Sequence, residues 1–361
     1  MRALLMVGDN QYGVLSQFAT GMEKDLTSLG VAVELVVISK ENDLSKQFSP
    51  LLEYDFIVSF NAVASDIAAP GYSVAEYAKQ KPFYIYTVDH PIHLMRRFIG
   101  LNIIVLCVDQ EHVGFCRLCG IKAEFFPHAV SAKSVSAQNA IPYQEKSDEI
   151  IFPVSFFDPT SWREKLNPVW NQIGPLVERA QNITDFMQLL GVLPRGNRPA
   201  SLQLDENIRR VCFTVDFYLR AKQRIQTLSY FEEQGTSLTV VGRNSEQYQD
   251  IAPSHQYLPA MEFTDLQQRI KQAKLVIHNS PGFAKGLHER VVEPYAMGTL
   301  ISGINLDYLA QECDDFFIQP EAIHALSAEQ YNQQQASAIA WIQSQHTWLK
   351  RWQKAIPELV Q

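Results

Sequence analysis

The chain of 361 residues lacks any long apolar run. No stretch reaches the roughly 18 residues that a membrane-spanning helix needs. The first apolar run, residues 3–7, ends at Gly8. It is too short for the core of a secretory signal and predicts a first strand instead. We therefore expect a cytoplasmic protein whose association with membranes, if it has one, is peripheral.

Long basic blocks are also missing. The chain has 31 Lys and Arg against 39 Asp and Glu, a formal net charge of -8. A protein that binds duplex nucleic acid ordinarily presents a basic stripe to the phosphates, so nucleic acid is not an expected partner. Cysteine is sparse: the five residues are an odd number in no recognisable frame. They indicate reduced thiols and not a disulfide scaffold.

Several catalytic motifs are absent as well. The sequence has no Gly-x-Ser-x-Gly elbow, Walker loop, Gly-x-Gly-x-x-Gly or Asp-x-Asp. Their absence argues against a serine hydrolase, a P-loop enzyme and a dinucleotide-dependent enzyme. His112, Cys116, Cys119 and His128 suggest zinc, but structural zinc usually takes paired ligands from loops. A buried cysteine face on a short helix explains the same residues, so we expect neither a metal nor a cofactor.

The composition that remains is globular, with 46% hydrophobic and 19% charged residues. The length suits two domains. In the first 141 residues, strand and helix signals alternate. The expected strands are residues 3–7, 31–38, 56–60, 83–87 and 102–108, and the expected helices are 15–29 and 112–119. Continuous apolar strands separated by helices predict a parallel sheet with both faces covered.

The second half repeats this pattern after residues 142–149, a polar stretch opened by a proline that we interpret as a linker. A strand signal restarts at Ile150 and returns near residues 237–241, 275–277 and 299–302. Residues 160–233 form a helical insertion interrupted by prolines, and residues 327–361 a long final helical stretch with an apolar stripe. The fold class is therefore α/β, with two Rossmann-like, doubly wound domains.

Residues 276–303 carry the clearest chemistry, because they predict a strand, a glycine loop, a helix and a second strand. Gly282 and Gly286 allow a backbone to approach a ligand closely. The loop leads into a helix N-terminus, whose N–H groups suit a diphosphate. Lys285 and Arg290 add cationic donors. Ordinary turn chemistry is the alternative explanation for the glycines.

Two glutamates in the same segment, Glu289 and Glu293, are four residues apart and share a helix face. A carboxylate at this point can accept hydrogen bonds from both hydroxyls of a ribose. A solvated helix face is the alternative. Pro294 is compatible with a helix that begins near Glu289 or Arg290, which keeps the N-terminus beside the glycine loop.

The spacing of five residues before an apolar strand is typical of one class of enzyme: Gly286, Glu289, Arg290, Glu293 and Gly298. Over residues 236–318 the sequence resembles the nucleotide-sugar segment of two-Rossmann (GT-B) glycosyltransferases, most closely the CgeB-like, group-1-related family. The resemblance implies that Glu293 binds ribose and that Gly286 and Arg290, with Lys285, bind the diphosphate. It also implies that Arg243, after an earlier strand, faces the nucleotide.

The resemblance further implies the transfer of a sugar from a nucleotide-diphosphate sugar to a glycan or other hydroxyl acceptor. Residues 1–141 would bind the acceptor and residues 150–326 the donor across a cleft, and residues 327–361 would cross back to the first domain. Two alternatives stay open: an epimerase or isomerase of the same shape, and a binding protein without catalysis.

An inverting transferase needs a general base near the acceptor hydroxyl. In open α/β sheets, ligands bind at the carboxyl ends of strands. Asp9 and Asn10 follow the first strand, Asp89 and His90 follow the fourth, and His128 follows another apolar run. We predict Asp9 or His90 as the base and the other three as substrate contacts. Loop capping, turn structure and a satisfied structural histidine are the alternatives.

Overall fold

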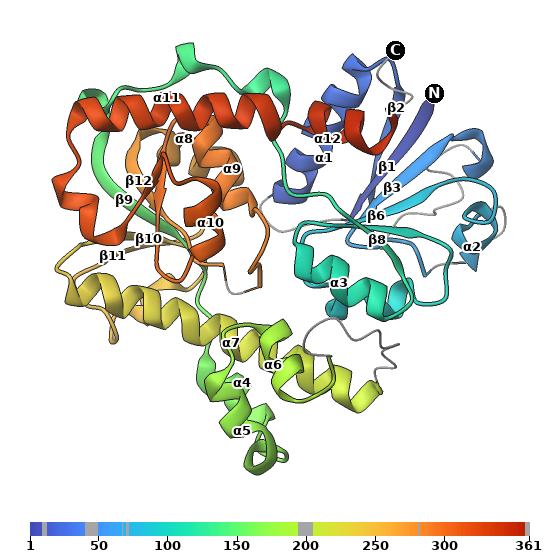
Figure 1. Ribbon diagram of the computed structural model, residues 1–361, viewed down its shortest axis with the longest axis horizontal. Coiled ribbons are helices and arrows are strands. Elements are labelled where there is room, and N and C mark those ends of the chain that lie inside the picture. The colour runs from blue at the N-terminus through green and yellow to red at the C-terminus, as the bar shows by residue number, and fades with distance from the viewer. Residues whose placement is uncertain are drawn as a thin grey trace. The chain divides into compact units, whose positions relative to one another are not determined.

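The computed structural model describes residues 1–8, 13–39, 50–66, 68–69, 72–193, 205–280 and 282–357. The chain forms two compact units, Met1–Val135 with Ile342–Gln361, and Ser136–Trp341. Each contains a six-stranded parallel sheet flanked by helices (Figure 1). The α/β class with two Rossmann-like sheets is therefore confirmed. The predicted Asp9 and Asn10 lie outside the described residues.

The sheet of the first unit has the strand order β2-β1-β3-β6-β7-β8. Its strands are β1 (Arg2–Gly8), β2 (Ala32–Ile38), β3 (Phe56–Phe60), β6 (Phe83–Thr87), β7 (Ile104–Cys107) and β8 (Lys122–Phe125). The short strands β4 (Ala68–Ala69) and β5 (Tyr72–Ser73) form an antiparallel pair. Helices α1 (Val14–Ser28), α2 (Val74–Tyr77) and α3 (Gln110–Leu118) connect the strands. The apolar runs become the central strands, which are buried on both faces.

The sheet of the second unit has the order β11-β10-β9-β12-β13-β14, all parallel. Its strands are β9 (Ser147–Pro153), β10 (Thr239–Val241), β11 (Gln256–Leu258), β12 (Ala273–Ile277), β13 (Leu300–Ser302) and β14 (Phe317–Ile318). From β9 the chain adds β10 and β11 on one side of the sheet, and it then adds β12, β13 and β14 on the other side of β9. The loops that follow β9 and β12 therefore diverge, which creates the crevice where open α/β sheets bind ligands.

The predicted insertion is helical where the structure describes it. It contains α4 (Pro159–Lys165), α5 (Trp170–Arg179), α6 (Ile183–Leu189) and α7 (Glu206–Glu233). The other helices of this unit are α8 (Phe263–Gln272), α9 (Glu289–Ala296) and α10 (Asp307–Glu312). The expectation that each proline interrupts the insertion is wrong at Pro175, which lies inside α5. Gly174 precedes it and lacks the Cβ atom with which a proline ring would clash.

The linker expected at residues 142–149 is shorter than predicted, because β9 already begins at Ser147. The first residues of β9 are polar or charged, so the hydrophobic pattern did not predict a strand there. Asp148 and Glu149 stand at its start, where their carboxylates pair with Lys274 and Arg269 of neighbouring elements. A polar sequence can therefore begin a strand when its charges have partners on adjacent elements.

The last segment forms two helices, α11 (Ala328–Gln345) and α12 (Trp348–Ala355), where one long helical stretch was expected. The break lies at Thr347, whose hydroxyl accepts a hydrogen bond from the backbone of Lys350 and caps α12. The backbone N–H of Trp348 donates to the Val130 carbonyl at 2.9 Å. Helix α12 packs on α1, so the end of the chain belongs to the first unit.

A buried carboxylate fastens α12 to the first unit. Asp25 of α1 is 1% exposed and accepts hydrogen bonds from the Ser131 hydroxyl at 2.8 Å, the Ala132 N–H at 2.9 Å and the Leu349 N–H at 2.9 Å. Asp25→Ala should lower the free energy of unfolding by about 2 kcal/mol, because two half-buried N–H groups lose their acceptor in the buried Asp25 carboxylate. Urea unfolding followed by circular dichroism measures this, with exposed Lys24→Ala as the control. An unchanged midpoint for Asp25→Ala would contradict it.

Candidate functional site

The segment singled out in the sequence folds as expected: β12, a loop, α9 and β13. Helix α9 begins at Glu289, and the His288 side chain caps it by accepting from the Arg290 N–H. The predicted start of this helix is therefore confirmed. Pro294 is the sixth residue of α9 and lies beyond the first turn, so its missing N–H removes one helical hydrogen bond, to the Arg290 carbonyl.

Arg290 lies at the crevice between the ends of β9 and β12. Its Nη1 donates to the Pro153 carbonyl at 3.3 Å and to Asn279 Oδ1 at 3.4 Å. Pro153 ends β9, and Asn279 follows β12. Burial lowers the pKa of the Arg290 guanidinium, Glu289 opposes this shift, and Arg220 adds to it. The basic residue predicted to hold a diphosphate is thus located where the fold favours a ligand.

Two further arginines, which the sequence did not reveal, reach this crevice from α7. Arg224 Nη1 donates to the Ser155 carbonyl at 2.7 Å, two residues beyond the end of β9. Arg220 Nε lies 2.9 Å from Asp216 Oδ2. A Cβ atom at Gly282 would lie 3.2 Å from Arg220 Nη2, so this glycine leaves room for the guanidinium. We call Arg220, Arg224 and Arg290 the arginine cluster.

The three guanidiniums of the arginine cluster lie close enough to affect one another's pKa. Burial lowers the pKa of Arg224 to about 10, and the positive charges of Arg290 and Arg220 contribute. Nε of Arg224 is buried without a hydrogen-bond partner among the described residues. Guanidiniums crowded in this way hold anions well, because each presents paired N–H donors to oxygen atoms. The cluster is therefore suited to a diphosphate.

The two predicted glutamates lie beside each other on α9. Glu293 Oε2 accepts a hydrogen bond from Gln267 Nε2 of α8 at 3.0 Å. Burial, and then the negative charge of Glu289, raise the pKa of the Glu293 carboxyl to about 8. Glu289 Oε2 lies 2.6 Å from His288 Nδ1. The pair thus has one carboxylate beside a cap histidine and one that holds a proton near neutral pH.

The raised pKa of Glu293 gives a stability test. Between about pH 4.5 and pH 8 the folded chain keeps a proton that the unfolded chain has lost, so this group reduces stability as pH rises through that window. Glu293→Gln keeps a neutral side chain and should lack the decrease. Its urea midpoint relative to wild type should therefore rise from pH 5 to pH 9, whereas exposed Glu329→Gln should show no such trend. Parallel pH profiles for Glu293→Gln and wild type would refute the shift.

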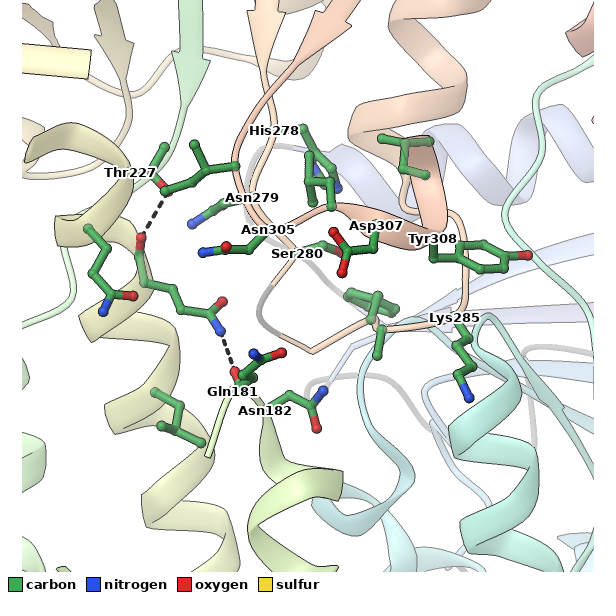
Figure 2. A pocket seen from close by; sticks show the side chains of 18 of the residues that line it. Gln181, Asn182, Thr227, His278, Asn279, Ser280, Lys285, Asn305, Asp307 and Tyr308 are labelled. Carbon is green, nitrogen blue, oxygen red and sulfur yellow. Dashed lines mark hydrogen bonds between the residues drawn. The ribbon is translucent and has the colours of Figure 1, made fainter. Parts of the chain in front are cut away.

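A pocket of about 530 Å³ adjoins this crevice, and all its lining residues belong to the second unit. Of the predicted residues, Lys285 and Gly286 line it, whereas Gly282, Glu289, Arg290 and Glu293 do not. Figure 2 shows His278 and Asn279 at one end of the pocket, with Gln181 and Asn182 facing them from the insertion. The pocket therefore combines the predicted loop with helices to which the sequence assigned no role.

Arg243 lies at the same edge of the sheet but is exposed and does not line the pocket. Its backbone N–H donates to the Ser155 hydroxyl at 3.2 Å, and its carbonyl accepts from the Phe156 N–H at 2.9 Å. At Gly242 a Cβ atom would come within 2.1 Å of the Val154 carbonyl, so only glycine allows this approach. Arg243 is thus tied to the segment that also contacts the arginine cluster.

The two candidate histidines of the first unit have interior partners. His90 is 0% exposed, and its Nδ1 accepts from the Ile92 N–H at 3.2 Å. Asp89 beside it is half-buried. His128 Nδ1 lies 2.8 Å from the Tyr86 hydroxyl, and its ring packs against Trp348. These contacts fit the structural alternatives for both histidines, and their roles toward a substrate stay predictions.

The described residues contain no group of three or more His, Cys, Asp or Glu able to hold a metal ion. Cys116 Sγ instead lies 4.0 Å from Cys107 Sγ in the core. Among the helices that the structure describes, none is long and apolar enough to cross a membrane.

The fold has clear counterparts among solved structures. The chain is similar to AviGT4, a glycosyltransferase involved in avilamycin A biosynthesis (10% identity, 100% of this chain and 97% of that chain covered, TM-score 0.53). It is also similar to an alpha-glucosyltransferase in complex with UDP (12%, 100% and 100%, 0.55) and to T4 phage BGT in complex with UDP-glucose (13%, 99% and 99%, 0.51). The fold is that of the GT-B glycosyltransferases.

No protein-family model and no curated protein matches the sequence. At identities of 10–13%, these similarities establish the GT-B architecture, but they do not establish substrates or the roles of residues. The chemistry of this chain must therefore be argued from its own residues.

Proposed function

We propose that the protein is a glycosyltransferase that binds a nucleotide-diphosphate sugar in its second unit and transfers the sugar to a hydroxyl or glycan acceptor. The observation that carries the proposal is the arginine cluster, which gathers three guanidiniums at the crevice of a Rossmann-like sheet. Two structures of similar fold hold UDP or UDP-glucose, which supports this choice of ligand.

In this proposal the arginine cluster binds the diphosphate, and the loop with Gly282, Lys285 and Gly286 lies along it. Glu293, whose carboxyl keeps its proton near neutral pH, exchanges hydrogen bonds with the ribose hydroxyls as both donor and acceptor. Glu289 and Arg243 are further contacts to the nucleotide-sugar. In the first unit the proposed acceptor contacts are Asn10, Asp89 and His128, and the proposed base is Asp9 or His90.

Calorimetry with nucleoside diphosphates, UDP among them, tests the donor site. We expect a diphosphate to bind and the matching nucleoside to bind more weakly, because the cluster pairs with phosphate. Glu293→Ala should weaken binding of the nucleoside as well, while exposed Glu329→Ala should leave both affinities unchanged. A protein that binds no nucleoside diphosphate would refute the proposal.

Incubation with nucleotide-sugars and no acceptor separates glycosyl transfer from the two alternatives. Slow hydrolysis of the sugar supports a transferase, isomerisation of the sugar supports an epimerase, and binding without turnover supports a non-catalytic protein. An acceptor screen should include DNA, because one similar structure contains UDP and a 13-mer DNA. The net charge of -8 leads us to expect no reaction there.

A further inference from the structure

The pocket of the second unit has one wall built by the insertion. Gln181 and Asn182 lie in the turn between α5 and α6, and Gln223 lies on α7. The opposite wall is the loop after β12, together with residues 304–311 around α10. Gln223 Nε2 donates to the Gln181 carbonyl, so the two parts of the insertion are joined at the pocket (Figure 2).

Uncharged polar side chains outnumber charged ones in this lining. Seven of the 25 lining residues are amides, and Thr227 and Ser280 add hydroxyls. Amides both donate and accept hydrogen bonds, as sugar hydroxyls do. Phe283 supplies an apolar ring for the C–H side of a ligand. Lys222 pairs with Glu178, so the charged residues of the lining give no strong field of one sign.

Two buried polar atoms in the lining lack partners among the described residues. They are Nδ1 of His278, in a side chain 1% exposed, and Nδ2 of Asn279, in a side chain 3% exposed. The oxygen of the Asn279 amide accepts from Arg290, which leaves its NH₂ group for a ligand. An unpaired buried amide is costly and rare in folded proteins, so it indicates a missing partner.

We propose that this pocket binds an uncharged sugar ring and that the amides of the insertion select which sugar is accepted. The sugar is either that of the nucleotide-sugar or a residue of a glycan, and both present the same hydroxyl chemistry. The first source rests on the proposed function, whereas the second is independent of it. Asn279 contacts both Arg290 and the pocket, which places a sugar next to the proposed diphosphate site.

Two substitutions remove pocket amides outside the proposed nucleotide site. Asn305 has a φ of 56°, so Asn305→Gly deletes the side chain without backbone strain. Gln223→Met keeps the length of the side chain and removes its amide, together with the hydrogen bond to the Gln181 carbonyl. Exposed Gln249→Ala, outside the pocket, is the matched control. Thermal melts confirm that each variant is folded.

Calorimetry then compares UDP with UDP-glucose, UDP-galactose and UDP-N-acetylglucosamine, and an oligosaccharide array is probed without nucleotide. We expect wild type to gain affinity from one sugar in the first arm or to bind a glycan in the second, and the arm that responds identifies the source. Asn305→Gly and Gln223→Met should each reduce this gain roughly three- to tenfold and spare UDP, since each removes one neutral hydrogen bond.

Sugar binding that both variants retain, or no contribution from a sugar in either arm, would overturn the inference. Binding of UDP with no sugar contribution would overturn it while leaving the proposed function intact. Glycan binding without any nucleotide binding would support it and refute the proposed function instead.

Discussion

Arg290→Ala should weaken the binding of UDP, or of whichever nucleoside diphosphate the protein prefers, roughly tenfold to hundredfold. A charge-assisted hydrogen bond contributes about 1.5–3 kcal/mol, and Arg290 supplies a guanidinium fork to the arginine cluster. The matching nucleoside should bind the variant as it binds wild type, because an arginine fork pairs with phosphate. Arg290→Lys should recover only part of the loss, since a lysine keeps the charge without the fork.

Calorimetry with the diphosphate and the nucleoside measures both effects. Arg210→Ala is the control, because Arg210 is exposed on α7, the helix that carries the other two members of the cluster. Arg290 also donates to Pro153 and Asn279, so a thermal melt must show that the variant is folded. Equal losses for both ligands would mean that Arg290 holds the loops in place and does not contact phosphate.

The hydrophobic pattern of the sequence predicted most of the fold, because the central strands of covered parallel sheets are apolar on both faces. Strands such as β3 and β6 are buried on both faces and are continuous apolar runs in the sequence. Strand β8 was not predicted because it lies at the sheet edge, with Lys122 and Glu124 exposed. An edge strand that is buried on one side only mixes polar and apolar residues, and such a sequence resembles that of a loop.

The proposed donor site was predicted only in part, for a different reason. Arg290 and Glu293 lie in one local segment whose spacing carries information. Arg220 and Arg224 lie in the insertion, about 70 residues earlier in the chain, and only the packing of α7 on the sheet brings them to the same crevice. Their spacing of four residues on a helix was the available signal, but it is equally typical of an ordinary charged helix face.

The sheet of the first unit has a change of strand direction of the same kind. Its strand order changes direction between β1 and β3, so the loops that follow these two strands mark the ligand side. After β3, three non-glycine residues have left-handed backbone conformations: Asn61, Ala62 and Ala64. A Cβ atom at Gly8 would lie 3.3 Å from Val63, so the end of β1 and the loop after β3 approach each other. Such strain concentrates at functional sites and supports a role for the residue that follows Gly8.

That residue is Asp9, and Asp9→Asn should lower turnover roughly 10²–10⁴-fold, the usual effect of losing a general base. Donor affinity should be unchanged, because the proposed donor residues belong to the second unit. The competing candidate is His90, which follows β6 and is fully buried. The imidazole of His90 accepts a hydrogen bond from the Ile92 N–H. His90→Ala should therefore lower the melting temperature whether or not His90 acts as the base.

Turnover and donor affinity of the two variants distinguish the two bases, because loss of the base removes proton transfer and spares donor binding. Release of UDP from a nucleotide-sugar measures turnover, and calorimetry measures donor affinity separately. Normal turnover in both variants would place the base elsewhere, with Asp89 and His128 as the next residues to replace. Loss of donor affinity in proportion to turnover would remove that residue from the acceptor side, because its effect would then lie in donor binding.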